Sequence, residues 1–389
     1  MRETLINLNK MAKILFYRSD WTANVTRQTE DAYGGVGYYR IVKVAEEARK
    51  AGHEVDIVGA KFTLKGETLE QRYTRIFSQY DVLWTCYSSH SDDASAMFYF
   101  RDKFKKKVIL DLDDNYLDIL DTHPLYDRLK ASKKDRAFIG TILSFADALT
   151  ISTEPLKQRM HEHFKTVYGI DKKMYIIPNF NEINDWKYTP VEKKGDKIII
   201  GYSGSNSHQN DLKMIMPHLA KVMDKYKNVY FESIGAISQK EIGMFDMFSK
   251  DALDRCDLVP ATATFNEYPK HLANQPWDIT LAPLEDNAFT RCKSHIKWME
   301  YAMFKMPTIA SRVYPYYVDL MGRKIVEHGY SGLLVKPSEW TDAIESLILD
   351  KEKRIRLGEN AYKSVSENWQ YENSGIPKVI NGMLKDLGV

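Results

Sequence analysis

Residues 189–212 read TPVEKKGDKIIIGYSGSNSHQNDL, and this stretch decides the fold that we predict. Its first eight residues are polar and include Pro190 and Gly195, a composition typical of a linker. The apolar run KIIIG at 197–201 then predicts a buried strand, which a small-residue turn and a helix at 212–226 follow. A strand–turn–helix pattern therefore restarts near the middle of a 389-residue chain, and the sequence predicts two consecutive α/β domains.

Apolar runs alternate with helical patterns on both sides of this stretch. The clearest helix is 36–51, where apolar residues recur at helical spacing and Gly52 supplies a stop. Strands that alternate with helices pair in parallel, so each domain should be a doubly wound sheet that binds ligands at its carboxyl ends. The predicted strands are 13–18, 54–59, 82–87, 107–112, 148–152 and 175–177, then 197–201, 229–234, 279–283, 308–311 and 332–335.

The same pattern sets the domain boundaries that we predict. Residues 1–10 precede the first strand and form an appendage. The first domain covers 11–188 and the second covers 189–368. The last segment, 369–389, contains an amphipathic helix that we expect to pack back on the first domain.

Composition excludes several classes of protein. The net charge is +2, which gives no overall indication of a nucleic-acid or membrane partner. The three cysteines form no CxxC pair, so neither a disulfide framework nor a zinc site is indicated. No apolar run approaches the roughly 18 residues of a membrane span, and the first ten residues lack an apolar signal core. These features predict a cytoplasmic protein of unknown oligomeric state.

Two glycine-containing turns stand where anions would bind. Gly34-Gly35-Val36-Gly37 opens the first helix, and backbone N–H groups at such a turn can approach an anion closely. An ordinary tight turn is the alternative. The second turn follows the strand at 197–201, and its small residues could cradle a phosphate or a ribose; they are Ser203, Gly204 and Ser205, with His208 as a phosphate contact or, alternatively, a helix cap.

The segment CKSHIKWMEY at 292–301 is the strongest cluster. Ser294 is a plausible N-cap, and Lys297 and Glu300 share a helix face because they are three residues apart. A helix start flanked by Lys293 and Lys297 suits a diphosphate, and Glu300 could accept both hydroxyls of a ribose. The alternative is a solvated face with a Lys297–Glu300 ion pair.

In this order and spacing, these segments resemble glycosyltransferase family 4 and its GT-B relatives, from residue 13 to residue 369. The segments that carry the resemblance are GGVGYYR, ADALTIST, YIIPNF, IIIGYSGSNSHQNDL, KSHIKWMEYAMFKMPTIAS and GYSGLLV. The resemblance implies two Rossmann-like domains facing across a cleft. It implies a hexosyl- or pentosyltransferase that retains configuration, uses a nucleoside diphosphate sugar (UDP favoured) and needs neither a metal nor a prosthetic group.

The resemblance also implies roles for individual residues. Glu300 would hold the ribose, while Lys293, Ser294 and Lys297 would face the diphosphate. Gly35 and Gly37 would approach the donor from the opposite domain. The family often has a second glutamate eight positions before the ribose-binding one, and here that position is Cys292. The contact to the transferred sugar is therefore expected to differ or to come from elsewhere.

The acidic run Asp111-Leu112-Asp113-Asp114 has three interpretations. It could be a metal-binding DxD, a pair of carboxylates that orient or deprotonate an acceptor hydroxyl, or a set of solvated turn acids. We take Asp113 and Asp114 as catalytic candidates on the acceptor side, together with His123, and predict no metal ion. Arg40, which ends GVGYYR, is a candidate acceptor contact.

A basic segment, MFYFRDKFKKK at 97–107, makes Lys105 and Lys106 further acceptor candidates. It could follow a phosphate backbone or a membrane surface, or be a solvated helix face. GVGYYR combined with SGSNSH also resembles glycosyltransferases of bacteriophages, which act in the host cytoplasm. Some phage enzymes of the GT-B class glycosylate hydroxymethylated DNA bases, so a flipped-out modified base is one acceptor hypothesis.

Other functions stay open. A surface polysaccharide or a lipid-linked glycan is the competing acceptor. A non-catalytic nucleotide-sugar-binding module, favoured by Cys292, and a nucleotide-sugar epimerase of the same fold are the alternatives to a transferase.

Overall fold

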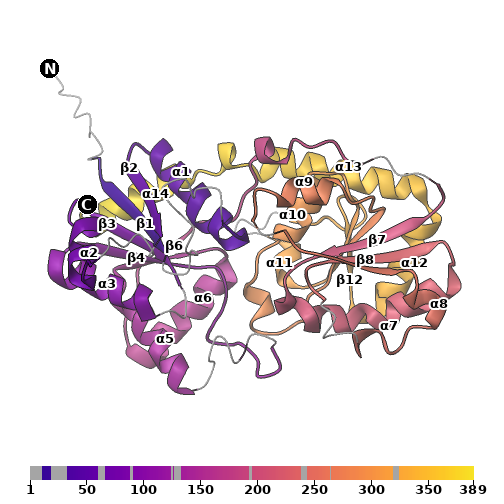
Figure 1. Ribbon diagram of the computed structural model, residues 1–389, viewed down its shortest axis with the longest axis horizontal. Coiled ribbons are helices and arrows are strands. Elements are labelled where there is room, and N and C mark those ends of the chain that lie inside the picture. The colour runs from indigo at the N-terminus through magenta and orange to yellow at the C-terminus, as the bar shows by residue number, and fades with distance from the viewer. Residues whose placement is uncertain are drawn as a thin grey trace.

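The computed structural model describes residues 11–18, 33–59, 66–87, 91–123, 126, 133–191, 195–237, 243–262, 264–318 and 324–389. Two α/β domains lie side by side, each built on a parallel six-stranded sheet (Figure 1). The predicted fold class, two doubly wound α/β domains, is thereby confirmed. The predicted appendage at 1–10 lies outside the described residues.

The first sheet has the strand order β2-β1-β3-β4-β5-β6, with all neighbours parallel. Its central strands are apolar runs that are buried on both faces, as parallel strands covered by helices must be, whereas the edge strands are partly exposed. The strands are β1 Lys13–Arg18, β2 Glu54–Gly59, β3 Val82–Cys86, β4 Lys107–Leu112, β5 Ala148–Ile151 and β6 Met174–Ile176. The helices that pack on it are α1 Lys43–Lys50, α2 Leu69–Phe77, α3 Ser91–Phe104, α5 Lys133–Phe145 and α6 Glu154–His163.

The second sheet has the order β12-β11-β10-β7-β8-β9. Its strands are β7 Ile198–Ser203, β8 Val229–Ile234, β9 Cys256–Val259, β10 Ile279–Ala282, β11 Thr308–Ser311 and β12 Leu333–Val335. Its helices are α7 Gln209–Lys225, α8 Lys250–Leu253, α9 Tyr268–Ala273, α10 Ile296–Ala302, α11 Tyr314–Tyr317, α12 Trp340–Leu349 and α13 Lys351–Asn368.

Both sheets reverse their direction of winding at the strand that starts the domain. The chain leaves β1 toward β2 on one side and returns to β3 on the other, and it leaves β7 toward β8 before returning to β10. In doubly wound sheets such a reversal opens a crevice at the carboxyl ends of the strands. The loops that follow β1 and β7 are the two glycine-containing turns, so the topology places both of them at a crevice.

The helix predicted at 36–51 begins as a π-helix, Gly37–Val42, and continues as α1. Every residue of the π-helix is buried, including the consecutive large side chains of Tyr38, Tyr39 and Arg40. An interior π-turn widens the helix, and such turns are frequent at functional sites. Here it carries Tyr38 and Tyr39 into contact with Phe265 and Glu300 of the second domain.

The chain crosses between the domains twice, and the two crossings lie side by side. The backbone N–H of Asn181 donates to Trp369 O (2.8 Å), and that of Tyr371 donates to Asn181 O (2.9 Å). After the second crossing, α14 (Ile376–Leu387) packs against α1 and β6 of the first domain, and Figure 1 shows it in yellow beside the indigo strands. Its apolar face, from Ile376 to Leu387, is buried there.

Candidate active site

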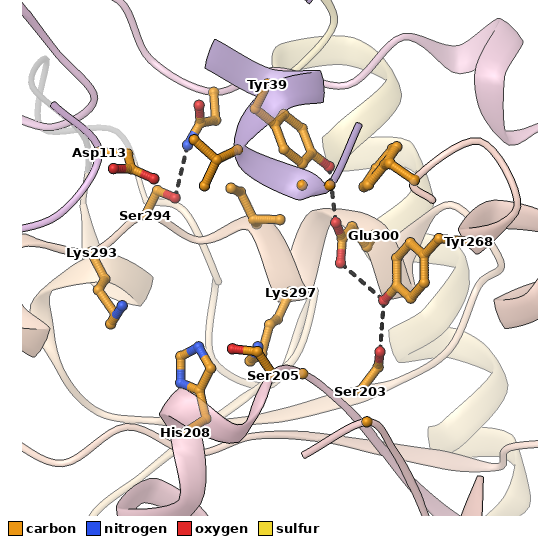
Figure 2. Close-up of a pocket in the computed structure, with 18 of the residues that line it drawn as sticks. Tyr39, Asp113, Ser203, Ser205, His208, Tyr268, Lys293, Ser294, Lys297 and Glu300 are labelled. Carbon is orange, nitrogen blue, oxygen red and sulfur yellow. Dashed lines mark hydrogen bonds between the residues drawn. The ribbon is translucent and has the colours of Figure 1, made fainter. Parts of the chain in front are cut away.

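A cavity of about 680 Å³ opens between the two domains. Its walls come from the carboxyl-end loops of both sheets, as the winding of the sheets requires. Its size lies within the range of small-molecule sites. It brings together most of the residues predicted as a site: Gly35, Arg40, Asp113, Asp114, Ser203, Gly204, Ser205, His208, Lys293, Ser294, Lys297 and Glu300 (Figure 2).

Lys297 extends into this cavity from the first turn of α10. Neither a hydrogen bond nor an ion pair to its ammonium group is present among the described residues; the group lies 5.3 Å from the centre of the Tyr202 ring. Burial lowers the pKa of Lys297 to about 8, although the nearby Glu300 opposes this effect. At neutral pH the side chain is therefore still mostly cationic, and it faces the cavity without an anionic partner.

Lys293 lies across the cavity and does have a partner. Its ammonium group donates to both carboxylate oxygens of Asp114, at 2.9 and 3.2 Å, which links the two domains. It also lies 4.6 Å from the centre of the Phe289 ring. An anion entering the cavity would compete with Asp114 for this lysine.

Each carboxylate oxygen of Glu300 accepts a hydrogen bond from a tyrosine hydroxyl. Tyr39 of the first domain lies 3.1 Å from Oε1, and Tyr268 of the second lies 3.1 Å from Oε2. Burial raises the pKa of Glu300 to about 7, while Lys297 and the two tyrosines act in the opposite direction. The predicted alternative, a solvated Lys297–Glu300 ion pair, is wrong because Lys297 and Glu300 both turn into the cavity.

The turn after β7 has the shape of a ligand cradle. Ser203, Gly204, Ser205 and His208 all line the cavity. A Cβ atom at Gly204 would lie 2.7 Å from the Tyr202 hydroxyl and 3.0 Å from the Lys297 ammonium group. A larger residue at this position would therefore force the Tyr202 hydroxyl and the Lys297 ammonium group to move. His208 Nδ1 lies 2.8 Å from Asp211 Oδ2.

The first domain contributes its glycine turn and its acidic run. Gly34 and Gly35 line the cavity, and a Cβ atom at either would meet no atom within 4 Å. Gly37 is buried in the π-helix instead. Burial raises the pKa of Asp113 to about 6, helped by Asp114 and Asp111, and Tyr116 donates to it at 3.1 Å.

The carboxylates of the acidic run turn to separate partners. Asp111 pairs with Arg40, and Asp114 pairs with Lys293. Among the residues that the structure describes, no group of three or more His, Cys, Asp or Glu side chains could hold a metal ion. His123 lies beside the main cavity, in a small crevice with Phe289 and Lys293, and burial lowers its pKa.

Solved structures with this two-domain architecture include glycosyltransferases and a putative UDP-N-acetylglucosamine 2-epimerase from Listeria monocytogenes, which matches with a TM-score of 0.52 and 11% identity, over 97% of each chain. A sucrose-phosphate synthase from Thermosynechococcus elongatus matches with a TM-score of 0.64 and 14% identity, over 97% of this chain and 99% of that chain. An α-glucosyltransferase in complex with UDP and a 13-mer DNA containing a HMU base matches with 0.64 and 11%, over 95% and 99%. This chain has the GT-B fold. A glycosyltransferase from Rickettsia africae matches with 0.60 and 12%, over 97% and 98%.

No protein-family model matches the sequence, and no curated protein does. The identities to the solved structures are low, so the similarity shows the GT-B fold alone. No helix within the described ranges is long and apolar enough to cross a bilayer.

Cys292 departs from the pattern of family 4, and the structure shows what it contacts. The side chain is buried and packs with the core of the first domain, away from the cavity lining. Asn115 Nδ2 lies 3.6 Å from its sulfur, and Thr153 donates to its backbone oxygen at 2.7 Å. Burial raises the pKa of Cys292 to about 12, so the thiol stays protonated. Cys292 therefore joins the domains and does not reach a ligand in this cavity.

Ser294 was predicted as an N-cap, and this prediction is wrong. The helix begins at Ile296, and His295 occupies the cap position without a side-chain cap bond. The Ser294 hydroxyl instead accepts a hydrogen bond from Asn179 Nδ2 at 3.0 Å, because the chain stays extended through Lys293. Ser294 still lines the cavity.

Arg40 lies at the cavity wall, but its guanidinium group is directed into the protein. It is 1% exposed, donates twice to Asp111 (2.7 and 2.9 Å), and donates once each to Ile177 O and Asn179 Oδ1. Four hydrogen bonds leave little capacity for an acceptor. The candidate acceptor contact is therefore a structural ion pair.

The basic segment is placed away from the cavity. Lys105 and Lys106 immediately precede β4, whereas the cavity lies at the carboxyl ends of the strands. Lys106 donates to the backbone oxygens of Ser78 and Tyr80, at the end of α2. The two lysines thus lie at the amino end of β4, whereas the other candidates gather at the carboxyl ends of the strands.

Reversing this charge tests that placement. We expect Lys105→Glu combined with Lys106→Glu to leave donor turnover within about twofold of the wild type, because neither lysine reaches the cavity. If the chain binds DNA, the salt dependence of that binding should be the same in the variant, since phosphate contacts by these lysines would add to its slope. Filter binding over a salt series measures both. A weaker salt dependence of DNA binding in the variant would show that these lysines contact the acceptor.

Several site residues have no local signal in the sequence. Tyr39 and Tyr268 contact Glu300, although they lie 261 and 32 residues away from it. Asn179 was noted only as part of YIIPNF, yet it joins Arg40 to Ser294. Asp211 fixes His208 from one helical turn away, and its i+3 spacing is the one signal that could have been used.

Proposed function

We propose that this protein is a glycosyltransferase that moves a sugar from a nucleoside diphosphate sugar, UDP being favoured, to an acceptor hydroxyl with retention of configuration. The observation that carries the proposal is the unpaired Lys297 ammonium group, which faces a cavity of about 680 Å³ beside the Glu300 carboxylate. A half-buried cation that faces a cavity without an ion-paired anion suits a site that binds an anionic ligand. The GT-B fold supports the same class of reaction.

In this proposal the donor spans the cavity. Lys297 and Lys293 bind the diphosphate, and they stabilise the negative charge that grows on it as the sugar leaves. Ser203, Gly204 and Ser205 approach the donor from the turn after β7. Glu300 accepts the ribose hydroxyls on the oxygens that Tyr39 and Tyr268 now contact.

The acceptor enters from the first domain. Asp113 faces the cavity, and with a pKa of about 6 it is mostly ionised at neutral pH. It can therefore accept a hydrogen bond from the attacking hydroxyl and orient it. The hydroxyl attacks from the face that the diphosphate leaves, and the leaving phosphate takes its proton.

A hydroxymethylated base of DNA is the acceptor that we propose to test first. The support is the match in fold to an α-glucosyltransferase solved with UDP and DNA containing a HMU base. A base must leave the duplex to reach a cavity between two domains. A surface polysaccharide or a lipid-linked glycan is the second acceptor class.

The decisive experiment measures nucleoside diphosphate release from a panel of sugar nucleotides, with and without DNA containing hydroxymethylated pyrimidines. Mass analysis of the digested nucleosides follows. Release stimulated by this DNA, with a sugar added to the base, supports the full proposal. Release that ignores DNA keeps the transferase and points to glycans. Binding without release supports a binding module, and an altered sugar nucleotide without an acceptor supports an epimerase.

Glu300→Gln tests the ribose contact. We expect the affinity for UDP to fall about 10- to 100-fold, because a hydrogen bond to a charged group contributes about 1.5–3 kcal/mol. Calorimetric titration with UDP measures the change. Glu359→Gln, at an exposed position on α13, is the matched control and should bind UDP as the wild type does. Equal affinity of Glu300→Gln and the control would remove Glu300 from the site.

A further inference from the structure

His208 and Asp211 form a hydrogen-bonded pair at the wall of the cavity. His208 ends the turn after β7, and Asp211 lies in the first turn of α7. The distance from His208 Nδ1 to Asp211 Oδ2 is 2.8 Å. The other oxygen, Asp211 Oδ1, accepts the backbone N–H of Glu285 at 2.8 Å, from the loop after β10. Two separate elements therefore fix the carboxylate, and the carboxylate fixes the imidazole.

This arrangement selects one tautomer of the histidine. A carboxylate accepts a hydrogen bond, so an ionised Asp211 keeps the proton of a neutral imidazole on Nδ1. The lone pair is then on Nε2, for which the described residues offer no hydrogen-bond partner. Figure 2 shows the imidazole in the same part of the cavity as the Lys293 and Lys297 ammonium groups. A neutral His208 thus presents an acceptor where the diphosphate is proposed to bind.

Burial and the charged groups around His208 favour its neutral form. Burial lowers the pKa of His208 well below its usual value, and the cations Lys297 and Lys293 lower it further. Asp114 raises the pKa of His208 and so opposes the two lysines, whereas His123 lowers this pKa as the lysines do. Asp211 itself has a pKa raised to about 6 by burial, so it is mostly ionised at pH 7.

A diphosphate reverses this balance. It places negative charge beside an imidazole whose neighbours were two cations, and a nearby anion favours the protonated form. A protonated imidazole donates from both nitrogens, so Nε2 changes from a repelling lone pair to a donor. Binding and protonation must then favour each other to the same extent, because linkage between two binding equilibria is reciprocal.

We propose that His208, held by Asp211, takes up a proton from solvent at Nε2 when the donor diphosphate binds, and donates that N–H to a phosphate oxygen. The Nε2 lone pair forms an N–H bond with the proton from solvent, no other covalent bond changes, and the proton returns to solvent when the nucleoside diphosphate leaves. Asp211 acts as a positioning residue through the histidine. The inference rests on the proposed function, since it needs a diphosphate in this cavity.

The sign of the pH dependence follows from this linkage. Between the pKa of His208 in the empty protein and its higher pKa in the complex, only the complex holds the proton. Raising the pH through that interval therefore weakens UDP binding, and Kd should rise by up to about tenfold per pH unit. Lys297, with a pKa of about 8, and Glu300, with a pKa of about 7, titrate nearby and add a background. Variants of His208 separate the contribution of this histidine to the pH dependence from the contributions of Lys297 and Glu300.

The test uses UDP as the probe and the full chain. Calorimetric titration at pH 7 in buffers of different ionisation enthalpy counts the protons taken up for each UDP bound. We expect His208→Asn to take up fewer protons than the wild type and to bind UDP about tenfold more weakly. Histidine-labelled NMR of the wild type gives an independent readout, because the Nε2 shift of His208 should move to the protonated range with UDP.

Asp211→Asn is the sharper variant. The amide can keep the hydrogen bond from Glu285 and donate to Nδ1, which places the proton on Nε2 without uptake from solvent. We expect UDP affinity within about threefold of the wild type at pH 7, but less proton uptake and a flatter pH dependence. Unchanged proton uptake in both variants, or a neutral His208 in the NMR spectrum of the UDP complex, would overturn the inference while leaving the proposed function intact. Failure of the wild type to bind UDP would overturn both.

Discussion

Replacing Lys297 with methionine is expected to lower kcat/KM about 100- to 1000-fold. The side chain is half-buried, and its ammonium group faces the cavity without a hydrogen-bonded or ion-paired anion among the described residues. Removing one preorganised group that stabilises developing charge typically costs a factor of this size. Methionine fills a similar volume, so the loss reports the charge and not the packing. Steady-state release of the nucleoside diphosphate measures it.

Two further variants give this prediction its controls. Lys305→Met removes an exposed lysine just beyond α10, 3.7 Å from Glu359, and should leave kcat/KM unchanged. Lys297→Arg keeps the charge in a larger side chain, and the space beside Gly204 is narrow, so partial activity is expected. If Lys297→Met were as active as Lys305→Met, the diphosphate could not bind where we propose.

Replacing Arg40 with methionine is expected to destabilise the first domain by about 3–5 kcal/mol. The Arg40–Asp111 pair is 1% exposed on both sides, with a distance of 2.7 Å between Nη2 and Oδ1. Asp111 also accepts from Thr150 at 2.6 Å, which cannot replace a cation. The substitution leaves a buried carboxylate without a counter-charge, and this penalty exceeds the loss of the pair itself. A lower midpoint of urea unfolding, followed by circular dichroism, measures the effect.

The double variant Arg40→Met/Asp111→Leu distinguishes charge from packing. It also removes the Asp111 carboxylate, which Arg40→Met leaves buried without a counter-charge. We therefore expect the double variant to be more stable than Arg40→Met alone. Lys324→Met, which breaks an exposed pair with Glu327, is the control and should leave the midpoint nearly unchanged. A midpoint for Arg40→Met equal to that of the control would show that the pair contributes nothing to stability.

Most strands were predictable because parallel strands covered by helices are continuous apolar runs, while β2 alternates apolar and acidic residues. β1, β2, β4, β8 and β11 begin and end at the predicted residues. β9 was missed because its sequence, CDLV, lies at the sheet edge and is only partly buried, so it lacks an apolar run. A pattern based on hydrophobicity detects burial, so the buried edge strand β12 was predicted and the partly exposed edge strand β9 was not.

The candidate site likewise contains residues that could be predicted from the local sequence and residues that could not. Lys297 and Glu300 could be grouped because helical spacing relates them, and Lys293 because it lies just before the helix. The two lysines at 105 and 106 were misplaced because composition marks a basic segment without showing which end of a strand it precedes. Tyr39 could not be assigned to Glu300, since their contact depends on how two domains face each other.

The position of α14 has a consequence for synthesis on the ribosome. The helix supplies an apolar face to α1 and β6, and Asn381 hydrogen-bonds His53 at 2.8 Å. The first domain therefore leaves the exit tunnel with one surface uncovered, and the helix that covers it is translated after the second domain. Domains commonly fold in order from the N-terminus during translation. Here the first domain is completed only after the second has emerged, so the nascent chain exposes an unfilled hydrophobic face throughout synthesis of the second domain.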